Sequence, residues 1–284
     1  MLHLTPDVLR LIDLALSEDQ AFSDPTTDAL VPPDLRGVGV IRSKAEGVLA
    51  GVELALAVFS RVDPSLETRV LMEDGSSLSP GDAVARVEGS ASAVLRAERP
   101  ALNFLQRLSG IATDTSRYVE VVRGMRARIV DTRKTVPGLR YLEKYAVRAG
   151  GGANHRMNLA DGILIKDNHI AAGRSRGMSL KETVDRALAR APHTIKVEVE
   201  VTNLEEVEEA LSAGAHIILL DNMSPDEMSR AVKLVDGRAV IEASGGIDLE
   251  TVRSVAGTGV DLISVGALTH SPKALDLSLD LEFS

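Results

Sequence analysis

The sequence predicts a two-part α/β protein, in which an α+β domain with an antiparallel sheet precedes a unit of repeated β-strands and α-helices. At 284 residues the chain exceeds the usual size of one small domain. In its second half, short apolar runs closed by polar residues alternate with helical patterns. In its first half, apolar and polar residues alternate between Gly-Asp turns, which is typical of an antiparallel sheet.

Six segments of the second half are predicted β-strands: "ARIVDT", "GILIKD", "IKVEVEV", "HIILLD", "AVIEASGG" and "LISVGAL". Helical patterns separate the last four, so we expect parallel strands joined by crossover helices. Such repetition builds either a doubly wound sheet or a barrel. A complete barrel of this kind has eight strands, so six strands indicate an incomplete barrel or a strand with a weak signal.

The first half predicts a separate α+β domain. Residues 1–20 have the apolar spacing of a helix, and residues 36–59 and 68–95 show the alternation of sheet strands. Residues 96–124 are strongly periodic and predict a long helix that bridges to the second unit. The spacing of Leu102, Leu105 and Leu108 in that helix predicts core positions.

The tail at residues 274–284 alternates like a strand, and we expect it to return to the first domain. The predicted first domain therefore covers residues 1–112 and is completed by residues 271–284. The predicted second domain covers residues 113–270.

Composition excludes several classes of protein. Without cysteine, the chain has no disulfide, thiolate metal site or cysteine nucleophile, which fits a reducing compartment. A formal net charge of -9 argues against nucleic-acid binding, because phosphate contacts need a basic face. Residues 1–20 carry acids among their apolar positions, unlike a signal peptide or a membrane span. We therefore expect a cytoplasmic protein with no nucleic-acid or membrane partner.

Positive charge is concentrated in one part of the chain. Residues 120–156 contain nine Lys and Arg against three acids, whereas residues 198–227 contain nine acids and no Lys or Arg. The acidic run has the spacing of a solvated helix face. Several of the basic residues instead follow predicted strands or lie in turns, which a solvated helix face does not explain.

Three cationic sites lie near predicted strand ends. Arg133 and Lys134 follow "ARIVDT", His155 and Arg156 follow a glycine run, and Lys166 follows "GILI". The functional groups of a barrel collect where strands end. Adjacent cations repel each other unless they are solvated or face an anion. The pattern favours a pocket for a ligand with several negative oxygens, because Arg offers a planar fork and Lys a point charge.

Glycine-rich turns accompany these cations. Gly150–Gly152 either cap the preceding helix or also shape the backbone beside the pocket. Ser244–Gly246 and Val265–Ala267 end the last two predicted strands. Backbone amides in the last two loops of such barrels often bind a phosphate group, so these two turns predict a phosphate site.

Glu200 and Asp221 end two consecutive predicted strands. One alternative is that each caps the next helix or pairs with an arginine. The other is that they bind ribose hydroxyls or a divalent cation, because Mg²⁺ prefers hard oxygen ligands. His155 has a comparable alternative as a capping residue. Four further histidines form no recognisable constellation: His3, His193, His216 and His270.

Taken in order, these segments resemble the quinolinate phosphoribosyltransferase family. The resemblance rests on "ERPALNFLQRLSGIAT", "DTRKTVPGLRYLEKYAVRAGGGANHRMNLADGILIKDNH", "VEVEV", "LLDNM", "EASGGI" and "SVGALTHS", which run from Glu98 to Ser271. The order of the preceding domain is also similar, so the resemblance covers nearly the whole chain. One departure is Val136, where the family pattern has a second threonine.

The resemblance implies an N-terminal α/β sandwich domain, an open and incomplete α/β barrel of the TIM-like type, and a homodimer with shared active sites. A higher oligomer stays open as an alternative. Arg99 would reach the active site of the neighbouring subunit. The implied catalytic residues are Lys134, Lys166, Glu200 and Asp221, and the last two would also face Mg²⁺. The residues implied to bind the substrates are Arg99, Thr132, Arg133, Lys134, His155, Arg156, Lys166, Glu200, Asp221, Ser244, Gly245, Gly246, Val265, Gly266 and Ala267.

The implied reaction transfers a phosphoribosyl group from phosphoribosyl pyrophosphate to quinolinate. Decarboxylation then gives nicotinate mononucleotide, with pyrophosphate and CO₂, in de novo NAD biosynthesis. Mg²⁺ would accompany the phosphoribosyl pyrophosphate, and no organic cofactor is expected. The reaction needs no nucleophilic side chain, so positioning and electrostatics would supply most of the acceleration.

Three alternatives to this function stay open at the level of sequence. A related transferase accepts nicotinate without decarboxylation, but a monocarboxylate would leave one cation site unfilled. A paralogous group associated with molybdate transport shares the Arg-Lys and Gly-rich motifs, although "NHR" and "LIKDNH" match the transferase better. A non-catalytic anion-binding barrel would bind ligand without turnover.

Overall fold

The computed structural model describes residues 2–283, which form two compact units. The first unit contains the chain up to Ser116, residues Val136–Gly151 and the segment from Ser271. The second contains Arg117–Thr135 and Gly152–His270. This division is by contacts within the chain, and the domain limits drawn from the sequence stay predictions.

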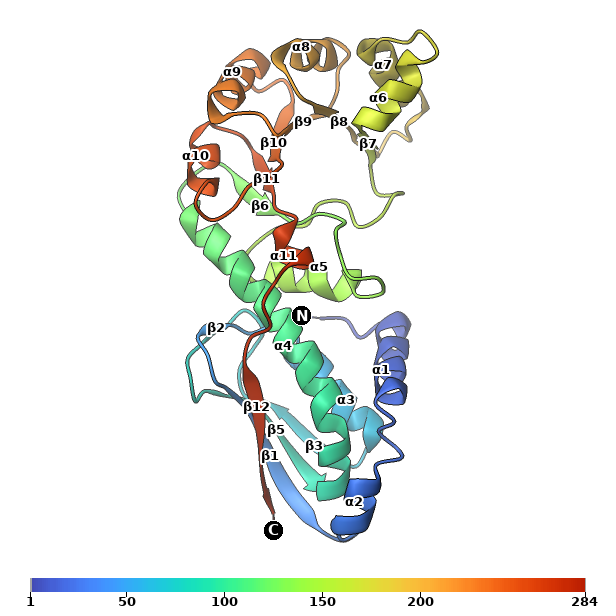
Figure 1. The fold of residues 1–284 in the computed structure, drawn as a ribbon, viewed down its shortest axis with the longest axis vertical. Helices are drawn as coiled ribbons and strands as arrows, with labels where there is room; N and C mark the ends of the chain where they lie inside the picture. The colour runs from blue at the N-terminus through green and yellow to red at the C-terminus, as the bar shows by residue number, and fades with distance from the viewer. Residues whose placement is uncertain (1, 284) are drawn as a thin grey trace. The chain divides into compact units, whose positions relative to one another are not determined.

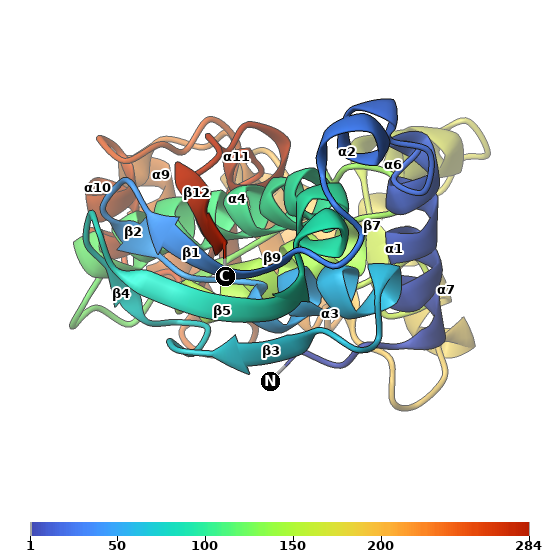
Figure 2. The same cartoon turned by 90° about the horizontal axis from the view of Figure 1, so that it is seen from below.

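The first unit is built on a four-stranded antiparallel sheet with the order β12-β1-β5-β3. These strands run side by side in the view of Figure 2. A two-stranded ladder of β2 and β4 accompanies the sheet. The strands span Arg36–Ser43 (β1), Gly47–Val48 (β2), Glu67–Val70 (β3), Ser77–Leu78 (β4), Ala83–Ser90 (β5) and Leu277–Phe283 (β12). Because β12 pairs with β1, the C-terminal tail belongs to the sheet of the first unit.

Helices cover this sheet and supply the core of the first unit. The helix α3 contacts β3 and β5, and Val94 of α4 faces Gly39 of β1. Leu102, Leu105 and Leu108 of α4 are buried, which confirms the core positions predicted from their spacing. The helices span Pro6–Glu18 (α1), Pro25–Leu30 (α2), Val52–Val62 (α3), Ala91–Val121 (α4) and Arg140–Ala149 (α5).

The second unit is built on a six-stranded parallel sheet with the order β6-β11-β10-β9-β8-β7. From β7 to β11, each strand lies beside the next one along the chain, and β6 lies beside the last strand, β11. This is the strand order of a barrel, whereas a doubly wound sheet would reverse its strand order partway. All six strands were predicted: Arg128–Val130 (β6), Ile163–Ile165 (β7), Val197–Val201 (β8), Ile217–Asp221 (β9), Val240–Ser244 (β10) and Leu262–Ser264 (β11).

The barrel is open between its first two strands. Within residues 2–283, β6 and β7 share no ladder, and the edge of β6 instead meets a single bridge from Val130 to Ala153. The segment between them therefore passes through the opening. This arrangement confirms the predicted incomplete barrel.

Helices pack against the outer side of the curved sheet (Figure 1). They span Asp167–Arg174 (α6), Leu180–Arg190 (α7), Leu204–Ser212 (α8), Pro225–Val235 (α9) and Val252–Gly257 (α10). The short helix α11 (Ala267–His270) follows β11 and is not one of these outer helices (Figure 1). The helices α7 and α9 begin with capping boxes, Ser179 with Glu182 and Ser224 with Glu227, which fix the residue at which each helix begins. No helix within residues 2–283 has both the length and the apolar composition needed to cross a bilayer.

Side chains alternate between the two faces of each barrel strand. In β8, Val197, Val199 and Val201 are fully buried under the helices, so Glu198 and Glu200 point to the interior of the barrel. The same alternation in β10 buries Ile241 and turns Glu242 inward. The apolar core thus lies between the strands and the helices, and the barrel interior contains charged side chains.

Candidate active site

A cavity of about 690 Å³ opens at the carboxyl ends of the barrel strands. Every site residue predicted from the sequence lines it, except Arg99. Parallel strands bring these residues together because all six end at the same edge of the sheet. The predicted residues that line the cavity are Thr132, Arg133, Lys134, His155, Arg156, Lys166, Glu200, Asp221, Ser244, Gly245, Gly246, Val265, Gly266 and Ala267.

Arg99 lies on α4 in the first unit, outside the set of residues that line the cavity. Its side chain is 58% exposed and forms an ion pair with Glu98 at 3.8 Å. The structure describes one chain, so the role of Arg99 stays a prediction.

Arg133 and Arg156 form a pair of like charges in the wall of the cavity. Burial lowers the pKa of the Arg156 guanidinium, and the charge of Arg133 lowers it further. The Nε atom of Arg133 is buried and has no hydrogen-bond partner within the described part of the chain. The two positive charges repel each other, and Arg133 keeps a buried N–H donor without a partner in that part of the chain. Both features suit the pair to bind an anion with several oxygens.

Two lysines, Lys134 and Lys166, add to the positive charge of the cavity wall. We name the four cations of this wall the rim: Arg133, Lys134, Arg156 and Lys166. The backbone of Lys134 is fixed because its N–H donates to Thr132 Oγ1 at 3.0 Å and its carbonyl accepts from Thr269 Oγ1 at 2.8 Å. The Lys166 ammonium donates to Glu200 Oε2 at 2.7 Å and keeps 46% of its side chain exposed. Both lysines are therefore positioned but accessible to a ligand.

The glycine turn after β10 is required by close packing against Asn222. Gly245 has a φ of +95°, and a Cβ atom there would lie 2.2 Å from Asn222 Oδ1 and 2.9 Å from its backbone nitrogen. The Asn222 N–H in turn donates to the Ser244 carbonyl at 2.9 Å. Only glycine fits this position. The resulting turn presents backbone to the cavity, as a phosphate site needs.

Glu200 and Asp221 lie at neighbouring strand ends of the cavity. Glu200 accepts from Lys166, and Asp221 Oδ2 accepts from Asn222 Nδ2 at 2.9 Å. Neither carboxylate caps the helix that follows its strand, because Asn203 caps α8 and Ser224 caps α9. The structure thus disfavours the capping alternative and leaves two oxygen ligands facing the cavity.

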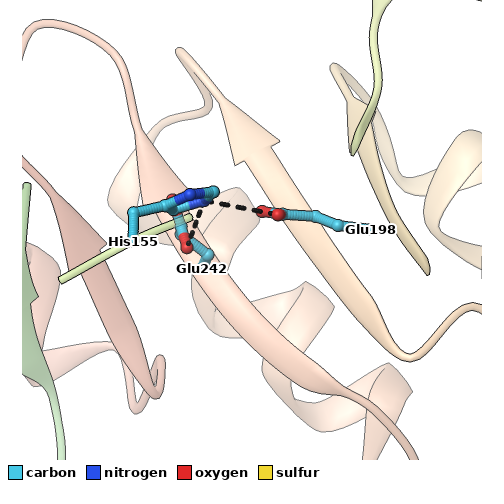
Figure 3. Close-up of side chains that lie close together, drawn as sticks. All are labelled: His155, Glu198 and Glu242. Atoms are coloured by element: carbon cyan, nitrogen blue, oxygen red, sulfur yellow. Dashed lines mark ion pairs between the residues drawn. The ribbon is translucent and has the colours of Figure 1, made fainter. Parts of the chain in front are cut away.

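His155 lies between two buried carboxylates (Figure 3). Its Nε2 is 3.3 Å from Glu198 Oε2 and 3.6 Å from Glu242 Oε2. The side chains are 13% exposed for His155, 7% for Glu198 and 1% for Glu242. We name His155, Glu198 and Glu242 the buried triad. Their ligand atoms lie within 4.8 Å of one another, and this is the group of potential metal ligands found within the described residues.

The buried triad is anchored from the end of β6. The carboxylate of Asp131 is fully buried and accepts from the His155 backbone N–H at 2.9 Å and from Asn154 Nδ2 at 2.6 Å. The segment that fills the opening of the barrel is therefore attached to β6 by a charged hydrogen-bonding group. This attachment places His155 and Arg156 in the cavity wall.

The structure decides between the two alternatives for the glycine run and adds one histidine to the cavity. Gly150 and Gly151 end α5 and do not line the cavity; a Cβ at Gly150 would lie 2.3 Å from the Ala112 carbonyl of α4, so close helix packing explains that glycine. His270, which had no predicted role, does line the cavity, and its ring lies close to Gly266. Its position six residues after a strand end gave no sequence signal.

Comparisons with known proteins identify the family. Residues 24–109 match the model of the quinolinate phosphoribosyl transferase N-terminal domain, and residues 111–280 match that of the C-terminal domain. The chain is 43% identical over 275 residues to the probable nicotinate-nucleotide pyrophosphorylase [carboxylating] of Bacillus subtilis (strain 168), covering 97% of this chain and 93% of that protein. It is 46% identical over 273 residues to the nicotinate-nucleotide pyrophosphorylase [carboxylating] of Mycobacterium leprae (strain TN), covering 94% of each chain.

The fold leads to the same family. The crystal structure of NadC from Streptococcus pyogenes superimposes with a TM-score of 0.94 at 43% sequence identity and covers 100% of both chains. Two family models that together span most of the chain, relatives above 40% identity and a matching solved fold agree with the motifs around the cavity. The chain belongs to the quinolinate phosphoribosyl transferase family.

Proposed function

We propose that this protein transfers a phosphoribosyl group from phosphoribosyl pyrophosphate to quinolinate and decarboxylates the product to nicotinate mononucleotide. The observation that carries this function is the rim, where four cations meet above two carboxylates in one cavity. Quinolinate is a dicarboxylate and phosphoribosyl pyrophosphate is a polyanion. A cavity that gathers several cations at strand ends suits both.

The rim and the carboxylates have different roles in this reaction. Arg133 and Arg156 bind the two carboxylates of the pyridine ring, and Lys134 and Lys166 bind phosphate oxygens. Ser244–Gly246 and Val265–Ala267 bind the 5'-phosphate through backbone amides. The pyridine nitrogen then attacks the anomeric carbon as pyrophosphate leaves. Because positive charge builds on the ribose in the transition state, the carboxylates of Glu200 and Asp221 stabilise it.

The residues at the strand ends fit a magnesium ion that arrives with phosphoribosyl pyrophosphate. Mg²⁺ is usually bound by one or two carboxylates together with substrate phosphates, and Glu200 and Asp221 offer this donor set. When bound, the ion would neutralise charge on the leaving pyrophosphate. Under the proposed function, the reaction needs Mg²⁺ and no organic cofactor. We also propose that the protein works in the cytoplasm.

We also propose a homodimer in which Arg99 completes the active site of the partner chain. Support comes from its position: Arg99 is exposed on α4 and carries a charge that the cavity of its own chain does not use. Mixing inactive Arg99→Ala subunits with inactive Lys134→Ala subunits should restore part of the activity, since one site of each heterodimer is intact. Verified subunit exchange without any recovery would contradict this role.

The function is tested by a chromatographic assay with phosphoribosyl pyrophosphate and Mg²⁺, run separately on quinolinate and nicotinate. We expect mononucleotide and CO₂ from quinolinate alone. Product from nicotinate alone would keep the cavity and change the substrate. Binding of both ligands without any product would support the non-catalytic alternative.

A further inference from the structure

The buried triad suggests a source for a proton that the reaction consumes. Under the proposed function, loss of CO₂ leaves an electron pair on carbon C2 of the pyridine ring, and this carbon must take up a proton. The lysines of the rim are poor donors for this step. A lysine that released its proton would lose the charge that holds the anionic substrates.

His155 is also unsuited to donate the proton. Its Nδ1 accepts the backbone N–H of Arg156 at 2.8 Å, so the ring proton of the neutral imidazole lies on Nε2. That Nε2 faces Glu198 and Glu242 at 3.3 and 3.6 Å. The imidazole proton is therefore directed to the two acids. The same tautomer argues against a metal ion in the triad, because a metal would need the lone pair of Nε2.

Two buried carboxylates share this one imidazole N–H. The Oε1 atoms of Glu198 and Glu242 are buried and have no hydrogen-bond partner within residues 2–283. Two adjacent buried carboxylates cannot both ionise easily, so one keeps a proton. Glu242 is the more buried of the two, at 1% against 7% exposure. Burial raises the pKa of Glu242 to about 7, and the charge of Glu198 adds to the rise.

We propose that Glu242 is the general acid that supplies the proton to C2 in the decarboxylation step. The bond between C2 and its carboxylate carbon breaks, and CO₂ leaves without that electron pair. The pair on C2 forms the new C–H bond with the proton of Glu242. The O–H electron pair stays on Glu242, which becomes a carboxylate. This assignment rests on the proposed function.

A second cavity provides for return of the proton. It measures about 320 Å³, lies at the amino ends of the barrel strands, and shares His155, Arg156 and Glu242 with the substrate cavity. Glu242 is thus part of the wall between the two cavities. Water in the second cavity can restore the proton without passing through the cavity that holds the substrates.

The charged surroundings of Glu242 define how this donor depends on pH. Glu198 on β8 raises the pKa of Glu242, His155 and the Ser264 hydroxyl of β11 lower it, and Asp131 after β6 raises it slightly. From β9, the residue paired with Glu242 is the apolar Leu219. Glu242 should therefore hold its proton below about pH 7 and lose it above. Loss of CO₂ should slow in the same range.

The test is a single-turnover reaction in which pyrophosphate and CO₂ are measured separately. With Glu242→Gln, pyrophosphate release should continue while CO₂ release slows by about 10²–10⁴-fold, the usual contribution of a general acid, and quinolinate mononucleotide should accumulate. The matched variant Glu198→Gln should keep CO₂ release at low pH but lose it at a lower pH than the wild type. A merely structural role would lower both products equally in Glu242→Gln.

The wild type separates failure of this assignment from failure of the proposed function. If wild-type protein releases neither product, the function itself is wrong. If Glu242→Gln does not fold, the ratio of CO₂ to pyrophosphate in the wild type decides: it should fall as pH rises through about 7. A ratio that stays constant between about pH 6 and pH 9, or equal loss of both products in a folded Glu242→Gln variant, overturns the assignment.

Discussion

The rim and the buried triad are two charged regions of one barrel, and they differ in sign and in exposure. Lys166 of the rim keeps 46% of its side chain exposed, whereas Glu242 of the triad keeps 1%. Accessible cations can bind anions that arrive and leave with each turnover. Buried acids cannot exchange partners, so they hold a fixed geometry and a proton. Under the proposed function, exposure would therefore separate groups that bind substrate from groups that store a proton.

Removing a cation from the rim should strongly lower the rate of the overall reaction. Lys134→Ala should lower kcat by about 10²–10³-fold, because a positioned charge that stabilises the transition state is lost. Its backbone contacts remain, so the far-UV circular dichroism spectrum should not change. Lys134→Arg, which keeps the charge but alters its geometry, serves as the control and should retain more activity than alanine. Full activity in Lys134→Ala would remove this residue from the site.

The turn after β10 allows a paired test of glycine geometry. Gly245→Ala should lower the free energy of unfolding by about 4 kcal/mol, from backbone strain plus a collision with Asn222. Gly246→Ala is the matched control: its φ is +60°, but no atom lies within 4 Å of the added Cβ. It should lose only about 1 kcal/mol. Urea unfolding measures both, and equal losses would contradict the packing argument.

The buried triad should make stability depend on pH. The folded protein keeps the Glu242 proton up to a pKa of about 7, whereas the unfolded chain loses it near the model-compound value of 4.5. The folded state therefore binds more protons in this interval, and stability falls as pH rises through it. In the wild type, the free energy of unfolding should fall by at most about 3 kcal/mol over this pH range, and Glu242→Gln should abolish this fall. Tm should be measured against pH for both proteins. If Tm depends on pH in the same way in wild type and variant, Glu242 does not titrate in this way.

Much of the rim could be predicted from sequence, because parallel strands end at one edge and their polar terminal residues must meet there. "DTRK", "LIK" and "LLD" each end in a residue that lines the cavity, and "VEVEV" contributes Glu200, one residue before its end. Alternation along the strands also accounts for the positions of the two acids of the triad. Glu198 lies two residues before Glu200, and Glu242 two before Ser244, so each shares the inward face of its strand.

The burial of the triad side chains could not be predicted from the sequence. The pattern "VEVEV" is equally typical of a strand with one solvated face, so nothing in it shows that Glu198 is 7% exposed inside a barrel. The orientation of the His155 ring depends on Asp131 and on the backbone of Arg156, which only the folded chain brings together. The sequence could not decide between the two alternatives for the glycines after α5, because the close contact of Gly150 with α4 is a tertiary feature.

The most direct test of the difference between rim and triad is calorimetric titration of quinolinate into wild type, Arg133→Ala and Glu242→Gln at about pH 6, where Glu242 is expected to carry its proton. Arg133→Ala should weaken binding by about 10–100-fold, the cost of a lost charged hydrogen bond. Glu242→Gln, which keeps the shape of the protonated acid, should bind quinolinate like the wild type. Equal weakening in both variants would contradict the division between a rim that binds and a triad that stores a proton.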